Sequence, residues 1–344
     1  MDYPTASVNN GNNTYVIAEA GVNHNGKLDI ALKLADAAKE AGADAVKFQL
    51  YNAVEQISIN SPTASYQRLA TGDKLMLDMA KNYDLPWYLH EKIANHCAEI
   101  EIDYMASCFD TDAIDFYRKL NGKVLKIASG EITNIELIQY ACKTNLPIIL
   151  STGMSTLDEI KFTTELILNN SSAPLTLLHC VSRYPTQIQD LNLNFIATLK
   201  SIFSLPIGLS DHTQHLSVGG WATTLGATVI EKHMTLDKSL VGPDHAMSCS
   251  PAELKVYIKE IREAQIALGS NEKILTQEEI SVRDVARRSV VASRDLRIGT
   301  IISPNDLLVK RPGNGISPLK KSDLIGKKLK KTINKDDQIT WDDF

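Results

Sequence analysis

The feature that most constrains the fold is a regular alternation of short apolar runs and amphipathic segments. Eight runs are typical of buried β-strands: residues 15–19, 44–49, 103–107, 124–128, 147–151, 175–179, 206–210 and 229–233. Helical spacing of apolar residues separates them, as in 28–41, which ends before Gly42. Eight strand–helix units in about 255 residues predict a (β/α)8 TIM barrel. A doubly wound open sheet is the alternative, and the lack of a GxGxxG motif after the first run disfavours it.

The texture of the chain changes after the last helical pattern. We expect a barrel domain with an N-terminal arm at 1–270, a linker at 271–286 and a small β-rich domain at 287–344. From Arg287 onward there are 13 Lys/Arg and 7 Asp, a net charge of +6. The rest has 23 basic and 34 acidic residues, a net charge of −11. No aromatic platform accompanies the basic residues, so we expect the small domain to meet an acidic protein surface and not nucleic acid.

Composition excludes several classes of protein. No apolar run approaches the roughly 20 residues of a membrane-spanning helix, and the first thirteen residues lack the pattern of a signal peptide. The five cysteines are odd in number and contain no CxxC pair, which argues against a disulfide framework or a zinc ribbon. We therefore expect a cytoplasmic protein with reduced thiols.

Polar and charged residues gather where the predicted strands end, which is where TIM barrels place their chemistry. Lys47 and Lys126 stand inside otherwise apolar runs, where a lysine is costly unless it meets an anion or a carboxylate. One hypothesis is a pocket for a small anion. Others are an ion pair of Lys47 with Glu19 or Glu231, and a lysine nucleophile that forms a Schiff base.

Two histidines follow neighbouring predicted strands, His212 after 206–210 and His233 at the end of 229–233. A single histidine is more often a structural hydrogen-bonding residue, but two at adjacent strand ends can share one divalent ion that acts as a Lewis acid. In that hypothesis Glu231 contacts a ligand without binding the ion itself, and Asp211 is a capping residue instead of a ligand.

Together these residues belong to motifs that resemble those of a known family. The motifs are Ile17-Ala-Glu-Ala-Gly-Val-Asn-His-Asn-Gly26, Val46-Lys-Phe-Gln49, Lys126-Ile-Ala-Ser-Gly-Glu-Ile-Thr-Asn134, Ile149-Leu-Ser-Thr-Gly-Met154, Leu178-His-Cys180 with Tyr184-Pro-Thr186, Ser210-Asp-His-Thr213, Ile230-Glu-Lys-His233, Gly242-Pro-Asp-His245 and Lys310-Arg-Pro-Gly-Asn-Gly-Ile-Ser317. They cover nearly the whole chain from about residue 15. The chain resembles the N-acetylneuraminate (sialic acid) synthases and, more broadly, the bacterial nonulosonate synthases.

The resemblance implies a barrel followed by an antifreeze-like (SAF, β-clip) domain. It implies condensation of phosphoenolpyruvate with an N-acyl mannosamine-type sugar, foremost N-acetylmannosamine, to give a sialic acid and phosphate. A legionaminic or pseudaminic acid synthase, which uses a 2,4-diacetamido-2,4,6-trideoxyhexose, is the alternative. A Schiff-base pyruvate aldolase and a non-catalytic sugar-binding protein are alternatives of other classes.

The resemblance also assigns roles to residues. The phosphoenolpyruvate site would comprise Lys47, Ser107, Lys126, Ser129, Ser151, Ser182 and Ser210. The sugar side would comprise Gln49, Tyr184 and Asp244, with Glu19 and Glu131 in proton transfer. His212 and His233 would hold Mn²⁺, with Mg²⁺ or Co²⁺ as alternatives. Arg311 would reach the barrel of a second subunit in a domain-swapped homodimer.

The chain departs from the family pattern in a few places. Relatives usually carry Ser-Thr-Pro-Phe-Asp where Ala106-Ser-Cys-Phe-Asp110 stands, and Pro in place of Ala128. The stretch 65–85 is shorter than usual. None of these changes removes a residue that is expected to bind phosphoenolpyruvate or the metal ion. They therefore bear on which sugar the protein uses.

Overall fold

The computed structural model describes residues 13–344, which divide into two compact units. The first unit ends at Gly269, and the second runs from Ser270 to Phe344.

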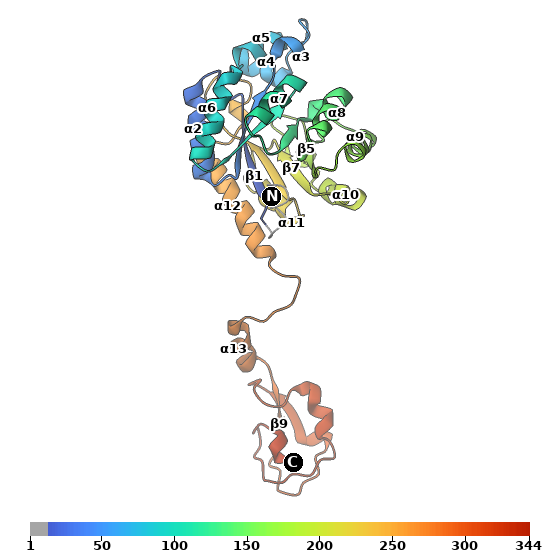
Figure 1. The fold of residues 1–344 in the computed structure, drawn as a ribbon. Helices are drawn as coiled ribbons and strands as arrows, with labels where there is room; N and C mark the ends of the chain where they lie inside the picture. The colour runs from blue at the N-terminus through green and yellow to red at the C-terminus, as the bar shows by residue number, and fades with distance from the viewer. Residues whose placement is uncertain (1–12) are drawn as a thin grey trace. The chain divides into compact units, whose positions relative to one another are not determined.

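The first unit is built on a closed barrel of eight parallel strands in the order β1 to β8, which confirms the predicted (β/α)8 fold (Figure 1). The strands are β1 (Tyr15–Gly21), β2 (Ala45–Leu50), β3 (Asp103–Cys108), β4 (Leu125–Ile127), β5 (Ile148–Ser151), β6 (Leu175–Cys180), β7 (Ile207–Asp211) and β8 (Val229–His233). The barrel closes because β1 pairs with both β2 and β8.

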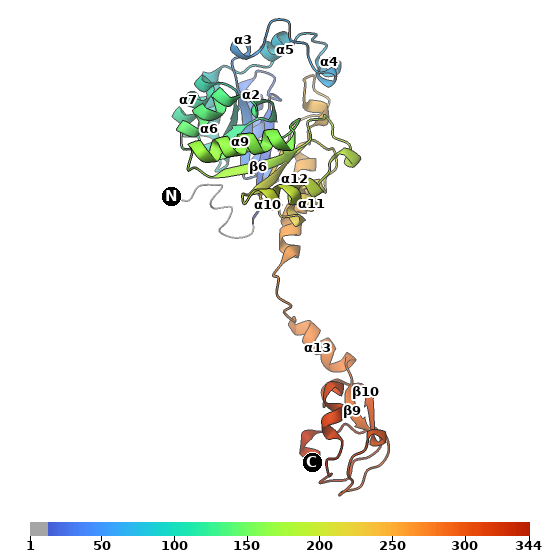
Figure 2. The same cartoon turned by 90° about the vertical axis from the view of Figure 1, so that its right-hand side faces the viewer.

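Helices follow the strands and surround the barrel (Figures 1 and 2). They are α2 (Leu28–Ala41), α6 (Trp87–Glu99), α7 (Thr111–Lys119), α8 (Ile135–Lys143), α9 (Leu157–Asn170), α10 (Asn194–Ile202), α11 (Val218–Thr224) and α12 (Pro251–Leu268). Their ends follow local chemistry. For example, the hydroxyls of Thr156 and Ser250 cap α9 and α12, and Gly42 ends α2 in the left-handed conformation.

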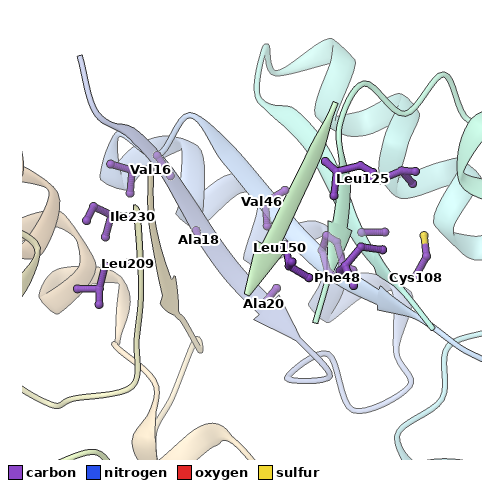
Figure 3. Packing of buried hydrophobic residues seen from close by; sticks show 14 of the residues in the cluster. Val16, Ala18, Ala20, Val46, Phe48, Cys108, Leu125, Leu150, Leu209 and Ile230 are labelled. Atoms are coloured by element: carbon purple, nitrogen blue, oxygen red, sulfur yellow. The ribbon is translucent and has the colours of Figure 1, made fainter. Parts of the chain in front are cut away.

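Alternation along each strand separates two apolar cores. Val16, Ala18 and Ala20 of β1 belong to the large core between the barrel and its helices, part of which Figure 3 shows. Ile17, between them, belongs to a smaller core inside the barrel, with Met105, Ile149 and Leu178 among its other members. Residues two positions further along the same strands, such as Glu19 and Ser107, continue the inward-facing series. The barrel is therefore apolar at its base and polar toward the carboxyl ends of its strands.

A long connection between β2 and α6, residues 51–86, departs from the regular pattern. It contains the short helices α3 (Ala53–Gln56), α4 (Ser65–Thr71) and α5 (Met76–Asn82), which gather at one end of the barrel in Figures 1 and 2. An antiparallel bridge pairs Pro62 with Leu75, which lie before and after α4 in the chain. We call this segment the β2–α6 connection.

The second unit is small and built from short pieces. It begins with α13 (Gln277–Ala286), which starts at the capping residue Thr276, and contains an antiparallel pair of β9 (Ser289–Ala292) and β10 (Leu307–Lys310). An isolated antiparallel bridge joins Ile301 to Lys328. A separate apolar core, which includes Val290, Leu296 and Leu324, stabilises this unit.

Within residues 13–344, no helix is both long enough and apolar enough to cross a membrane.

Candidate active site

A cavity of about 480 Å³ lies where the strand ends and the β2–α6 connection meet. Its lining includes every predicted site residue except Arg311: Glu19, Lys47, Gln49, Ser107, Lys126, Ser129, Glu131, Ser151, Ser182, Tyr184, Ser210, His212, His233 and Asp244. Arg311 lies in the second unit, is exposed, and donates from Nε to the Ala286 carbonyl at 2.8 Å. The structure thus brings all the barrel candidates to one mouth.

Lys47 and Lys126 are buried and both contact carboxylates and hydroxyls. The Nζ of Lys47 lies 2.5 Å from Glu19 Oε2 and 3.6 Å from Glu231 Oε2, so the ion-pair hypothesis for this lysine is correct in the structure. Lys47 also donates to Ser107 Oγ at 2.8 Å, and Lys126 donates to Ser151 Oγ at 2.7 Å. An anion in the cavity would meet two ammonium groups that the fold already holds in place.

Glu231 contacts both lysines. Its Oε2 lies 3.8 Å from Lys126 Nζ, and its Oε1 accepts from Ser210 Oγ at 3.2 Å. Burial alone would raise the pKa of Glu231, but Lys126 and Lys47 outweigh it and lower the pKa to about 2. Burial likewise lowers the pKa of Lys126, and only part of this is offset by Glu231. Glu231 is therefore a fixed negative charge between two lysines.

Glu19 is the opposite case. Burial raises its pKa to about 7, since Lys47 offsets only part of the desolvation and the charge on Glu231 adds to it. Gln49 Nε2 lies 3.4 Å from Glu19 Oε1, on the cavity side. A carboxyl group that titrates near neutrality can both accept and release a proton.

Ser129 and Ser182 meet around Gly153, a residue of the loop after β5. The Gly153 amide donates to Ser129 Oγ at 3.0 Å, and the Ser129 hydroxyl lies 3.5 Å from Cys180 Sγ. A Cβ on Gly153 would stand 2.2 Å from Ser182 Oγ, so only glycine permits this approach. Glu131, at the cavity edge, accepts from Asn134 Nδ2 at 2.7 Å.

The two histidine rings lie side by side, with centroids 5.4 Å apart. His212 Nδ1 lies 2.9 Å from the Val181 carbonyl, which can only accept, so this nitrogen carries the hydrogen and Nε2 is left as a ligand. Burial, together with His212, holds the pKa of His233 well below its ordinary value, so His233 is neutral.

The pair fits a loosely held divalent ion. Among residues 13–344, the buried Nδ1 of His233 has no hydrogen-bond partner, and the Asp244 Oδ2 is 3.9 Å from it. The same part of the chain has no group of three or more His, Cys, Asp or Glu side chains able to hold a metal. An ion on His212 and His233 would thus take its remaining ligands from water and substrate.

The β2–α6 connection completes the cavity with residues that the strand pattern does not predict. Tyr66 of α4 stacks on Tyr184, with ring centroids 4.9 Å apart, and Tyr184 in turn lies 4.2 Å from the His212 ring. Met76 and Met79 of α5 also line the cavity. The only sequence signal for these residues is that the connection is too long for a simple strand–helix turn. Cys180, at the end of β6, also lines the cavity. It belongs to the motif Leu178-His-Cys180, but the sequence did not predict it as a site residue.

Comparisons with known proteins show which family the chain belongs to. A model of the NeuB family matches residues 34–273, and a model of the SAF domain matches residues 287–344. An N,N'-diacetyllegionaminic acid synthase of Legionella pneumophila is 42% identical over 95% of this chain and 94% of its own length. The human N-acetylneuraminate-9-phosphate synthase is 32% identical over 94% of this chain and 91% of its own.

A solved structure shares the fold. It is the N-acetylneuraminic acid (sialic acid) synthetase of Leptospira borgpetersenii in complex with citrate, which superposes with a TM-score of 0.71 at 34% identity and covers 79% of this chain and 92% of its own. The family match covers well over half of the chain, and the relatives align along almost all of it. The chain therefore belongs to the NeuB family and carries a C-terminal SAF domain.

Proposed function

We propose that this protein is a nonulosonate synthase that condenses phosphoenolpyruvate with an N-acylated amino sugar and releases inorganic phosphate. The observation that carries the proposal is one cavity that is lined both by two buried lysines and by a pair of neighbouring histidines. Lysines and serines suit a small, highly anionic substrate. A divalent ion on the neighbouring histidines would polarise the carbonyl group that such a substrate attacks.

The residues of the chain divide the chemistry as follows. Lys47, Lys126 and the serines bind the carboxylate and phosphate of phosphoenolpyruvate. C3 of the enol attacks the aldehyde carbon of the open-chain sugar, water adds at C2, and the C–O bond to phosphate breaks. Glu19, with a pKa of about 7, is suited to hold or move the proton of the attacking water.

His212 and His233 would hold the divalent ion, for which Mn²⁺ is our first candidate and Mg²⁺ or Co²⁺ are alternatives. When bound, such an ion supplies Lewis-acid polarisation of a carbonyl oxygen. The Val181 carbonyl fixes the orientation of His212, and Asp244 lies beside His233 at the sugar end.

Two sugars fit the proposal. N-acetylmannosamine is the sugar to which the sequence motifs point first. The lining of the cavity favours a 2,4-diacetamido-2,4,6-trideoxyhexose, because Ile57, Met76 and Met79 of the β2–α6 connection present apolar surface to the substrate. The 42% identity to a legionaminic acid synthase, against 32% to the human enzyme, supports the same sugar.

We further propose that the protein works as a homodimer in the cytoplasm, with the SAF domain of each chain over the barrel of the other. The opposite net charges of the two parts of the chain, +6 and −11, support such a contact. Cys97, Cys108, Cys142, Cys180 and Cys249 are all buried and unpaired, which agrees with a reducing compartment.

The test is an assay with phosphoenolpyruvate, Mn²⁺ and a panel of N-acyl hexosamines that contains both candidate sugars. We expect release of one phosphate per sugar and a product whose mass equals sugar plus phosphoenolpyruvate plus water minus phosphate. Borohydride trapping of pyruvate on Lys47 or Lys126 would instead support a Schiff-base aldolase. Absence of phosphate release with every sugar would support a non-catalytic binding protein.

A further inference from the structure

Asp244 lies on the loop that follows β8, and that loop is tied to the loop after β1. Because β1 and β8 are neighbours in the barrel, their carboxyl ends meet at the same edge. The residues that join the two loops are Asn23, Asn25, His245 and Ser248. Along the chain, the two asparagines lie more than 200 positions from His245 and Ser248. We call these four residues the brace.

The first part of the brace is a directed chain of hydrogen bonds. Asn25 Nδ2 donates to the Val241 carbonyl at 3.1 Å, which leaves its Oδ1 facing His245 Nε2 at 3.0 Å. An amide oxygen only accepts, so Nε2 of His245 carries the hydrogen. The other ring nitrogen, Nδ1, lies 2.7 Å from the Thr235 hydroxyl, whose oxygen also lies 3.1 Å from the Asp237 carbonyl. His245 thereby links the two loops through a ring whose Nε2 carries a hydrogen.

Gly242 allows this ring to lie where it does. A Cβ on Gly242 would stand 2.5 Å from His245 Cδ2 and 3.2 Å from Asn25 Oδ1. His245 is fully buried beneath the turn that contains Gly242 and Asp244. The turn is therefore packed directly on the chain of hydrogen bonds.

The second part of the brace holds Asp244 by its backbone. Ser248 Oγ donates to the Asp244 carbonyl at 2.7 Å, and the Ser248 amide donates to the same oxygen at 3.1 Å. Asn23 Nδ2 donates to Ser248 Oγ at 2.9 Å and to the Met234 carbonyl at 2.8 Å. Asn23 is itself buried.

We infer that Asn23, Asn25 and His245 are positioning residues that hold the Asp244 carboxylate at the sugar side of the cavity. The two parts of the brace fasten the backbone on both sides of Asp244, so the carboxylate cannot move without breaking buried hydrogen bonds. None of the three residues lines the cavity, whereas Asp244 does. The role in sugar binding rests on the proposed function, while the brace itself rests on the contacts alone.

The test compares two neutral substitutions of one residue. In His245→Gln the side-chain amide nitrogen reaches the position of Nε2 and keeps the bond to Asn25. In His245→Asn the amide ends at the position of Nδ1 and loses that bond. We expect His245→Asn to raise the KM for the sugar about tenfold, the loss expected for one buried hydrogen bond. The KM for phosphoenolpyruvate should change less than twofold, and His245→Gln should stay near the wild type for both substrates.

A second variant removes the brace from the other loop. Asn25 has a φ of +50°, so Asn25→Gly deletes the amide and keeps a backbone conformation that glycine adopts freely. We expect it to behave like His245→Asn. Thermal unfolding of each variant shows whether it is folded, and Asn25→Gly decides the question should His245→Asn not fold.

A measurement that needs no substrate separates the brace from its function. Amide hydrogen exchange of residues 241–248 should be faster in His245→Asn and Asn25→Gly than in His245→Gln. Equal exchange in all three would overturn the brace, including in the case where no sugar is condensed and the proposed function fails. Faster exchange with equal rises in both KM values would overturn the link to the sugar.

Discussion

At the scale of single residues, the site shows how neighbours set the chemistry of identical side chains. Glu19 and Glu231 are both buried inside the barrel, yet the pKa of one is about 7 and that of the other about 2. Glu231 lies within 3.8 Å of both Lys47 and Lys126, whereas Glu19 contacts Lys47 and is repelled by Glu231. Two carboxylates with separated pKa values are typical of an acid–base site.

This contrast predicts a pH dependence of stability. The folded-state pKa of Glu19 lies above its ordinary value of 4.5, so its contribution to stability is fully present below pH 4.5. That contribution is lost as the pH rises through about 7. Glu19→Gln cannot titrate, so we expect the free energy of unfolding of the wild type to fall relative to the variant across this window. Urea unfolding at several pH values between 4.5 and 8 measures this difference in free energy, and parallel curves would contradict the pKa assignment.

The same substitution also bears on catalysis. We expect the kcat of Glu19→Gln to fall about 100-fold or more.

The histidine pair yields a second residue-scale prediction. Replacing either His212 or His233 with Ala removes half of the proposed ligand set, so we expect both variants to retain Mn²⁺ far less well and to lose most activity. Titration calorimetry or the electron paramagnetic resonance of Mn²⁺ measures retention without turnover. His215→Ala is the matched control, because His215 is exposed and stacks on Trp221 away from the cavity. Unchanged Mn²⁺ binding in the two test variants would exclude the ligand assignment.

At the scale of elements, the strands and the β2–α6 connection supply different parts of the cavity. The strands supply the buried lysines, serines and histidines, whereas α4 and α5 supply Tyr66, Met76 and Met79. A rigid barrel with a variable connection over its mouth is the usual way in which this fold changes substrate. We therefore propose that the connection contributes to the choice of sugar.

Met76 and Met79 provide the corresponding prediction. If their apolar surface contacts the deoxy end of the sugar, Met76→Gln and Met79→Gln should lower kcat/KM for the diacetamido-trideoxyhexose relative to N-acetylmannosamine. We expect a change of about tenfold in the ratio, which is typical when the fit of one small group in a pocket is lost. Leu69→Gln, at an exposed position of α4 that does not line the cavity, is the control. An unchanged ratio in both test variants would place sugar selection elsewhere.

At the scale of the whole molecule, the chain is two units with separate apolar cores and opposite charge. Arg311 stands at an exposed position in the basic unit, next to the end of β10. A guanidinium there is available to a partner surface, which is the contribution that the proposed dimer requires of it.

Mixing two impaired chains tests the shared site, with the sugar well below the raised KM of Arg311→Ala. We expect Arg311→Ala to raise the KM for the sugar more than that for phosphoenolpyruvate, and the wild type to run as a dimer in size-exclusion chromatography with light scattering. If Arg311 acts on the partner's barrel, unfolded and co-refolded Arg311→Ala and Glu19→Gln chains should recover about a quarter of wild-type activity. Half of the dimers are then mixed, and each has one intact site of two. Mixed dimers without recovery, or a monomer with full activity, would contradict sharing.

Local patterns in the sequence were enough to predict the barrel and most of its mouth. Apolar runs with period 2 determine which strand residues face inward, and parallel strands bring their carboxyl ends to one edge. The strand pattern alone therefore places Lys47, Lys126, His212 and His233 together.

What depended on the tertiary structure was everything that joins distant loops or depends on burial. The stacking of Tyr66 on Tyr184 and the bond between Asn25 and His245 join residues more than 100 positions apart, and no local period records such pairs. The separate pKa values of Glu19 and Glu231 likewise follow from distances to two lysines. The sequence alone therefore determined the scaffold and the kinds of groups at its mouth. Only the packing of the chain decided how those groups are charged, oriented and held.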